Sequence, residues 1–240
     1  MKPMITRNRT IPGFTATIVT TLLLLSLFLV GTATAGQARP QAVSAPALNS
    51  PIGELEAVLN NARDIYEFAK LNKWKHMGSK LMTLKKAAQS HPLAANTTNP
   101  DSLLPKLAET ISDLEHAIAS QQRLDSMIYA NRITIISAKM SAPLTPRIPT
   151  NLLVIAYCAR KLEILAETRH VDTMTEIVYK IHLSWQPLIP QVIEHGGSKE
   201  IKKFAEAMKR LEAARTAADY ARQAAMVLEE VAVLEQIFTK

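Results

Sequence analysis

The chain has 240 residues, a formal net charge of +7, one cysteine and 5% aromatic residues. A single cysteine excludes an internal disulfide. Three of the charges belong to the first nine residues, so +4 remains on the rest, which is too little for the dense basic surface of a nucleic-acid-binding protein. With only 7 glycines and no alternating β-branched runs, the composition predicts an all-α, up-and-down helical bundle of five to six helices.

Residues 1–35 have the three parts of a secretory signal peptide. The cations Lys2, Arg7 and Arg9 precede an uncharged apolar run over 18–30, and Ala33-Thr34-Ala35 supplies the small residues of a cleavage site. The run is shorter than the roughly 20 residues that a spanning helix needs. We therefore expect cleavage after Ala35 and a periplasmic or secreted protein. The alternative is an uncleaved N-terminal helix that anchors the chain in a membrane.

After the leader, the pattern predicts a flexible linker over 36–51 and one all-α domain over 52–240. Proline residues 143, 146 and 149 predict an extended connector within that domain. Apolar residues three and four apart predict helices over about 52–71, 73–89, 101–139, 150–168 and 171–187, and a last helix of about 40 residues from Ser198.

The two halves of the domain resemble copies of one another. A shift of 97 residues aligns 44–140 with 141–237 and places identical residues together. Examples are Ala62-Arg63 with Ala159-Arg160, Met77 with Met174, and Leu114-Glu115 with Leu211-Glu212. The breaks and caps recur in the same order, so we predict a duplication of a three-helix unit with a long third helix. Two such units are expected to pack about a pseudo-two-fold axis.

Motifs for metal, haem or catalysis are weak. Glu167 and His170 fit one Glu-x-x-His, and Asp113 to His116 is a near match, but both are expected to be surface residues because a di-iron bundle needs further ligands. Methionines at 127, 174 or 208 could ligate haem together with His182, although a core role is the simpler interpretation. We expect Cys158 to be an inert core thiol, no bound cofactor, and no enzymatic activity.

Two clusters are candidate contact sites. Lys73, Trp74, Lys75 and Lys80 form a basic helix face that could meet a partner or an anionic membrane surface, although a solvated face with one packing tryptophan is more ordinary. Tyr179, His182 and Trp185 are expected to share one helix face as an aromatic cluster.

These features favour an exported binding protein that acts as a scaffold, adaptor or chaperone in the periplasm or cell envelope. Its partner would be a protein or another envelope component, bound along helix faces or grooves. The alternatives are a metal- or haem-binding bundle and, behind it, an enzyme of unfamiliar type. A large exposed apolar groove would favour the binding protein, whereas coloured or metal-containing purified protein would favour the metal- or haem-binding bundle.

Overall fold

The computed structural model describes residues 50–90 and 103–240, apart from the side chain of Val171. The predicted signal peptide and nearly all of the predicted linker lie outside these residues. Helices make up 84% of the described part of the chain, which contains no strand. The prediction of an all-α helical bundle is therefore confirmed.

The described residues form nine α-helices, so the prediction of five to six was wrong. Their bounds are α1 (Pro51–Lys70), α2 (Trp74–Ala88), α4 (Leu104–Ala119), α5 (Arg123–Ser141), α6 (Thr150–Glu167), α7 (Met174–Trp185), α8 (Leu188–Glu194), α9 (Ser198–Glu212) and α10 (Ala217–Thr239). Two short 3₁₀ turns, Ala142–Leu144 and Val171–Thr173, precede α6 and α7.

Several helices end in the same local geometry, with a left-handed residue just past the last turn. Asn72, Gln121, Arg169 and Gly196 all have positive φ. In each case the amide of the following residue donates to a carbonyl five residues earlier, as Gln122 does to Ala117 at 2.8 Å. This pattern satisfies carbonyls that a helix end would otherwise leave without partners. Only one of the four residues is glycine, so the sequence shows this stop signal weakly.

Neither predicted long helix is continuous. The helix expected over 101–139 breaks at Gln121, where φ is +52°, and separates into α4 and α5. The helix expected from Ser198 breaks before Thr216, which has extended backbone and caps α10 by accepting a hydrogen bond from the amide of Asp219 at 3.1 Å. The Thr216 hydroxyl also donates to the Asp219 carboxylate at 2.7 Å, a reciprocal arrangement typical of a helix start.

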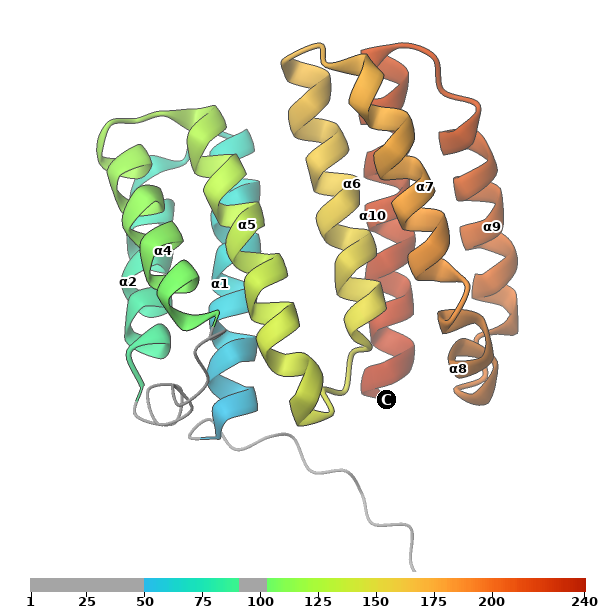
Figure 1. The fold of residues 1–240 in the computed structure, drawn as a ribbon, viewed down its shortest axis with the longest axis horizontal. Helices are drawn as coiled ribbons and strands as arrows, with labels where there is room; N and C mark the ends of the chain where they lie inside the picture. Colours follow the sequence, from blue (N-terminus) through green and yellow to red (C-terminus); the bar gives the residue numbers. More distant parts are fainter. Residues whose placement is uncertain (1–49, 91–102) are drawn as a thin grey trace, which may run out of the picture. The chain divides into compact units, whose positions relative to one another are not determined.

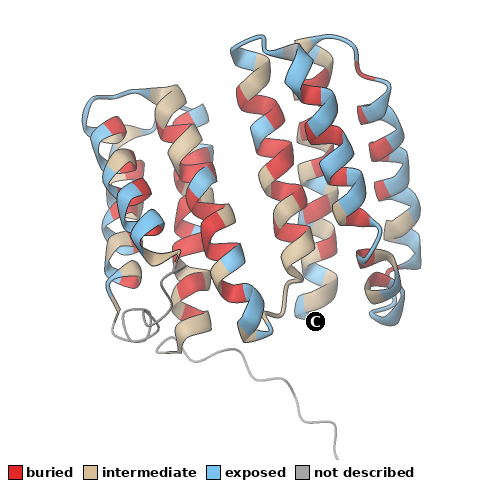
Figure 2. Cartoon of the chain, in the orientation of Figure 1, coloured by how far each residue is buried: buried red, intermediate tan, exposed pale blue. Residues whose placement is uncertain are grey.

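The helices pack as two groups, which we call the first half (α1, α2, α4 and α5) and the second half (α6 to α10). Figure 1 shows them side by side, joined through the segment after α5. Each half has its own apolar core, and Ile164 of α6 belongs to the core of the first half. Figure 2 shows buried residues on the sides of the helices that face neighbours, whereas the outward sides of α4, α7 and α9 are mostly exposed.

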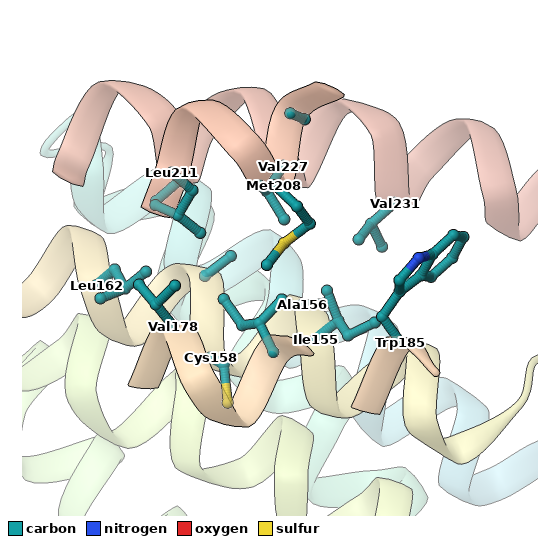
Figure 3. Packing of buried hydrophobic residues seen from close by; sticks show 14 of the residues in the cluster. Ile155, Ala156, Cys158, Leu162, Val178, Trp185, Met208, Leu211, Val227 and Val231 are labelled. Carbon is teal, nitrogen blue, oxygen red and sulfur yellow. The ribbon is translucent and has the colours of Figure 1, made fainter. Parts of the chain in front are cut away.

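The second core gathers side chains from all the longer helices of its half. Figure 3 shows Ile155 and Leu162 of α6 beneath Met208 and Leu211 of α9, with Val227 and Val231 of α10 nearby. Trp185 stacks on Phe204 with ring centroids 4.1 Å apart. Burial of large apolar side chains is the main favourable term in folding, so each half holds much of its own stability.

The two halves match in detail at the predicted shift of 97 residues. The left-handed residues Asn72 and Arg169 are 97 apart. The ion pair Lys85–Glu115 (2.7 Å) and the polar contact His182–Glu212 (3.3 Å) join equivalent helices at equivalent positions. These correspondences are what an internal duplication leads us to expect, although each half has four main helices instead of the three predicted. The duplication itself stays a prediction.

Candidate functional site

The two halves meet through a buried polar network centred on Tyr66 of α1. Its ring is fully buried, and its hydroxyl donates to the carboxylate of Glu163 on α6 at 2.7 Å and lies 3.2 Å from the carbonyl oxygen of Arg160. Lys70 of α1 binds the other oxygen of Glu163 at 2.9 Å. Burial, reinforced by the charge of Glu163, raises the pKa of the Tyr66 hydroxyl far above its ordinary value, so it remains a donor. The contact fixes α1 against α6.

Two further ion pairs join the halves on either side of this centre. Arg63 of α1 binds Glu235 of α10 through two hydrogen bonds, of 2.6 and 3.0 Å. Arg123 of α5 binds Glu167 of α6 in the same two-pronged way, and that hydrogen bonding raises the pKa of the guanidinium. Paired guanidinium–carboxylate contacts fix geometry as well as contributing energy. The junction therefore has a defined polar pattern.

Arg160 is the exception in this network. It is only 8% exposed, and its Nε and Nη1 atoms have no hydrogen-bond partner. No ion pair involves it within the described residues; the Tyr66 ring, 5.6 Å from its guanidinium carbon, is its one aromatic contact there. Burial, and then the nearby charge of Arg63, lower its pKa. The nearby charges of Glu67 and Glu235 act in the opposite direction and raise it. Arg160 is therefore a buried cation that has carboxylates nearby but no direct ion pair among the described residues.

An open cavity of about 710 Å³ lies where α1 and α6 end and α5 and α10 begin. We call it the junction cavity. Its polar lining residues are Lys70, Glu163, Glu167, Arg169 and Thr216, and its apolar lining residues are Met127, Ala166, Ala217, Ala218 and Ala221. No local motif in the sequence predicts this site. The available signal was a set of charged residues, Arg63, Arg160 and Glu163, placed at core-facing positions of otherwise apolar helices.

The predicted basic face lies on α2 and at its start, but its four residues differ in environment. Lys73 and Lys75 are exposed and form no ion pair with any described residue. Trp74 is half-buried and packs against the first core. Lys80 forms an ion pair with Asp64 of α1 at 2.7 Å, so its charge is already balanced within the fold. The stripe that faces outward along α2 is instead Lys75, Ser79, Met82 and Lys86.

The three residues expected to form an aromatic cluster do not pack together. Trp185 is in the core against Phe204, whereas Tyr179 is 61% exposed and His182 is paired with Glu212. The reason is the helical repeat of 3.6 residues per turn. Residues three apart point in directions that differ by about 60°, so residues six apart, such as Tyr179 and Trp185, differ by about 120° and face different surroundings. Tyr179 and His182 border a smaller hollow of about 370 Å³, together with Tyr220 and Arg215.

The residues considered for metal or haem ligation lie apart. Met127, Met174 and Met208 are buried in the two cores, while His182, His170 and His116 are exposed. No group of three or more metal-ligating side chains occurs among residues 50–90 and 103–240. Cys158 is a buried free thiol, as predicted, and burial raises its pKa to about 11.

No described helix is both long enough and apolar enough to cross a bilayer. Comparison with known proteins gave no match: no protein-family model, curated protein or solved structure matches this chain.

Proposed function

We propose that the chain is an exported helical-bundle binding protein that acts as a scaffold, adaptor or chaperone in the cell envelope, and that α2 docks its partner. The observation that carries this proposal is the charge of α2, which has four lysines, one histidine and no acidic residue. Lys75 and Lys86 lie on its outward stripe without an ion pair among the described residues, on either side of Met82. Met82 is 69% exposed, and Leu71, just before the helix, is 60% exposed.

An acidic protein surface fits this stripe better than a lipid bilayer does. A helix that lies in a membrane surface needs a wide apolar face. The apolar face of α2, formed by Met77, Leu81 and Leu84, is already buried in the first core. What remains outside is a single methionine between cations. Unpaired lysines around an apolar side chain are complementary to a partner surface that has acidic groups around a small recess. Such complementary charges determine how two proteins are positioned against each other.

A second outward helix supports the scaffold or adaptor role. In the second half, α7 occupies the place of α2, and Tyr179 stands 97 residues after Met82. Tyr179 and Leu183 are both exposed, one helical turn apart, beside Lys180 and Glu176. The two outer helices thus present different chemistry, one basic and one mixed with a tyrosine. A protein with two unlike docking faces can bring two unlike partners together.

The test is charge reversal on α2 with a matched control on α9. The double variant Lys75→Glu and Lys86→Glu is compared with Lys199→Glu and Lys202→Glu, which change the same charge at exposed positions of another helix. Partner recovered with the full chain from the envelope of its native host should fall by at least about 10-fold in the α2 variant and stay unchanged in the control. Recovery from the unsubstituted chain should also weaken as ionic strength rises. Equal losses in both variants would contradict docking through α2.

A vesicle experiment separates protein docking from lipid docking. The full chain is sedimented with phosphatidylglycerol vesicles and with neutral phosphatidylcholine vesicles. Docking on a protein predicts little binding to either, with no effect of the α2 reversal. Strong binding to the anionic vesicles that the reversal abolishes would overturn the proposal in favour of a membrane-surface role.

A further inference from the structure

The junction cavity is a hollow that is open to solvent, at the ends of α1 and α6 and the starts of α5 and α10. Four alanines, at 166, 217, 218 and 221, line it, and Met127 is its only large apolar residue. A hollow of about 710 Å³ is within the size range of small-molecule sites, which also occur preferentially between packed units.

The charges around the cavity do not balance. Lys70 is neutralised by Glu163 and Glu67, and Glu167 by Arg123. Arg169, which lines the opening, has no ion pair or hydrogen bond from its side chain to any described residue. Arg160, one helical turn before Glu163, is buried without a direct ion pair, and the charges of Glu67 and Glu235 favour its charged form. Arg169 is therefore the lining cation that no described carboxylate neutralises, which favours an anionic ligand at the opening.

We propose that the junction cavity binds an anionic amphiphile, with its carboxylate or phosphate head at Arg169 and its hydrocarbon chain along Ala166, Ala217 and Ala221. Apolar side chains supply the non-directional contact that a hydrocarbon chain needs, and Arg169 determines which end of the ligand lies at the opening. This site is distinct from the outward stripe of α2 and goes beyond the docking role proposed above. Failure of either proposal leaves the other standing.

The binding test uses four probes and the full chain in calorimetric titration. Dodecanoate and dodecyl phosphate, kept below micelle formation, should each bind once per chain. Dodecyltrimethylammonium has the same chain with the opposite charge and should bind at least about 10-fold more weakly. Inorganic phosphate should not bind. A preference for one of the two anionic probes identifies a carboxylate or a phosphate as the natural head group.

Two substitutions locate the ligand. Ala221→Phe fills the cavity and should abolish dodecanoate binding, whereas Ala232→Phe, at an exposed position of the same helix, should not. Ala166→Leu fills the cavity from α6 and serves as a second test if the first variant does not fold, as judged by circular dichroism. Dodecanoate binding that persists in a folded Ala221→Phe or Ala166→Leu chain would overturn the proposal.

The head-group contact has its own matched pair. Arg169 has a φ of +56°, so Arg169→Gly removes the charge at a position where glycine adds no strain. Asn72→Gly makes the same backbone change at the equivalent loop, where φ is +55°, without changing charge. We expect Arg169→Gly to weaken dodecanoate binding by about 10-fold and to reduce discrimination against the cationic probe, with no effect from Asn72→Gly. Equal binding of the anionic and cationic probes to the unsubstituted chain would also contradict the proposal.

Discussion

At the scale of single residues, the most informative positions are polar groups buried between apolar helices. Tyr66 and Glu163 are 97 positions apart, and so are Arg63 and Arg160. Tyr66 and Glu163 bond to each other, while Arg63 has a carboxylate partner and Arg160 has none. Equivalent positions have therefore acquired different electrostatic surroundings. The difference lets matched substitutions separate the role of a paired cation from that of an unpaired one.

The two arginines should respond in opposite ways to replacement by methionine. Arg63→Met leaves the half-buried carboxylate of Glu235 without its partner and should lower the free energy of unfolding by about 2 kcal/mol. Arg160→Met removes a buried charge that forms no direct ion pair with any described residue and should leave stability unchanged or raise it. Urea unfolding of the two variants at neutral pH and low salt measures the difference. A loss of similar size in both would mean that Arg160 has a stabilising partner.

Cys158 predicts a specific loss of stability at alkaline pH. Its thiol pKa is raised to about 11 in the folded chain, so the folded state keeps the proton that the unfolded state gives up near pH 9. The stabilising contribution is fully present below pH 9 and is lost as the pH rises toward 11. Between these limits the unsubstituted chain should lose about 2 kcal/mol more than Cys158→Ala does. Parallel stability curves for the two chains would contradict this.

At the scale of elements, the sequence carries strong information about helices and weak information about their ends. Spacing of apolar residues located α1, α2 and α6 to within a few residues, and Pro143, Pro146 and Pro149 marked the connector between the halves. The breaks at Gln121 and Thr216 were missed because apolar spacing continues across both. Arg169 and Gln121 adopt a left-handed backbone conformation that residues other than glycine, asparagine and aspartate rarely adopt. The residue types at these positions therefore do not indicate that a helix ends there. The start of α10 does carry a sequence signal, because Thr216 stands three residues before Asp219, the spacing of an N-terminal capping motif.

The cap at Thr216 should be worth a measurable amount. Thr216→Ala removes the hydroxyl that accepts from the amide of Asp219, and should cost about 1 kcal/mol of unfolding free energy. Thr239→Ala, at the last position of the same helix, should change stability by less than about 0.5 kcal/mol. Thermal unfolding followed by circular dichroism compares the two. Equal effects would indicate that Thr216 does not act through its cap.

At the scale of the whole molecule, apolar patterning determines each half, and polar contacts determine how the halves meet. The cores could be expected from the sequence, because their residues recur every third or fourth position. The junction could not, because pairs such as Arg63 with Glu235 lie 172 positions apart and depend on the packing of complete helices. The same limit applies to the junction cavity, which comes from alanines that look like ordinary helix residues. A site built from long-range pairs leaves no local motif.

Export predicts a defined N-terminus for the mature protein. If the leader is cleaved after Ala35, terminal sequencing of protein isolated from its native host should begin at Gly36. The protein should also be recovered without detergent from the compartment outside the inner membrane. An intact leader, with the chain retained in the membrane fraction, would favour the anchored alternative.

Site-specific photo-cross-linking in the living host tests docking through α2 most directly. A photoreactive residue is placed at position 82 on the outward stripe, and in a second chain at position 202 on α9. Our account predicts one discrete cross-linked protein of acidic surface from position 82, lost when Lys75 and Lys86 are reversed, and none from position 202. The same cross-links from both positions, or cross-links to lipid alone from position 82, would contradict it.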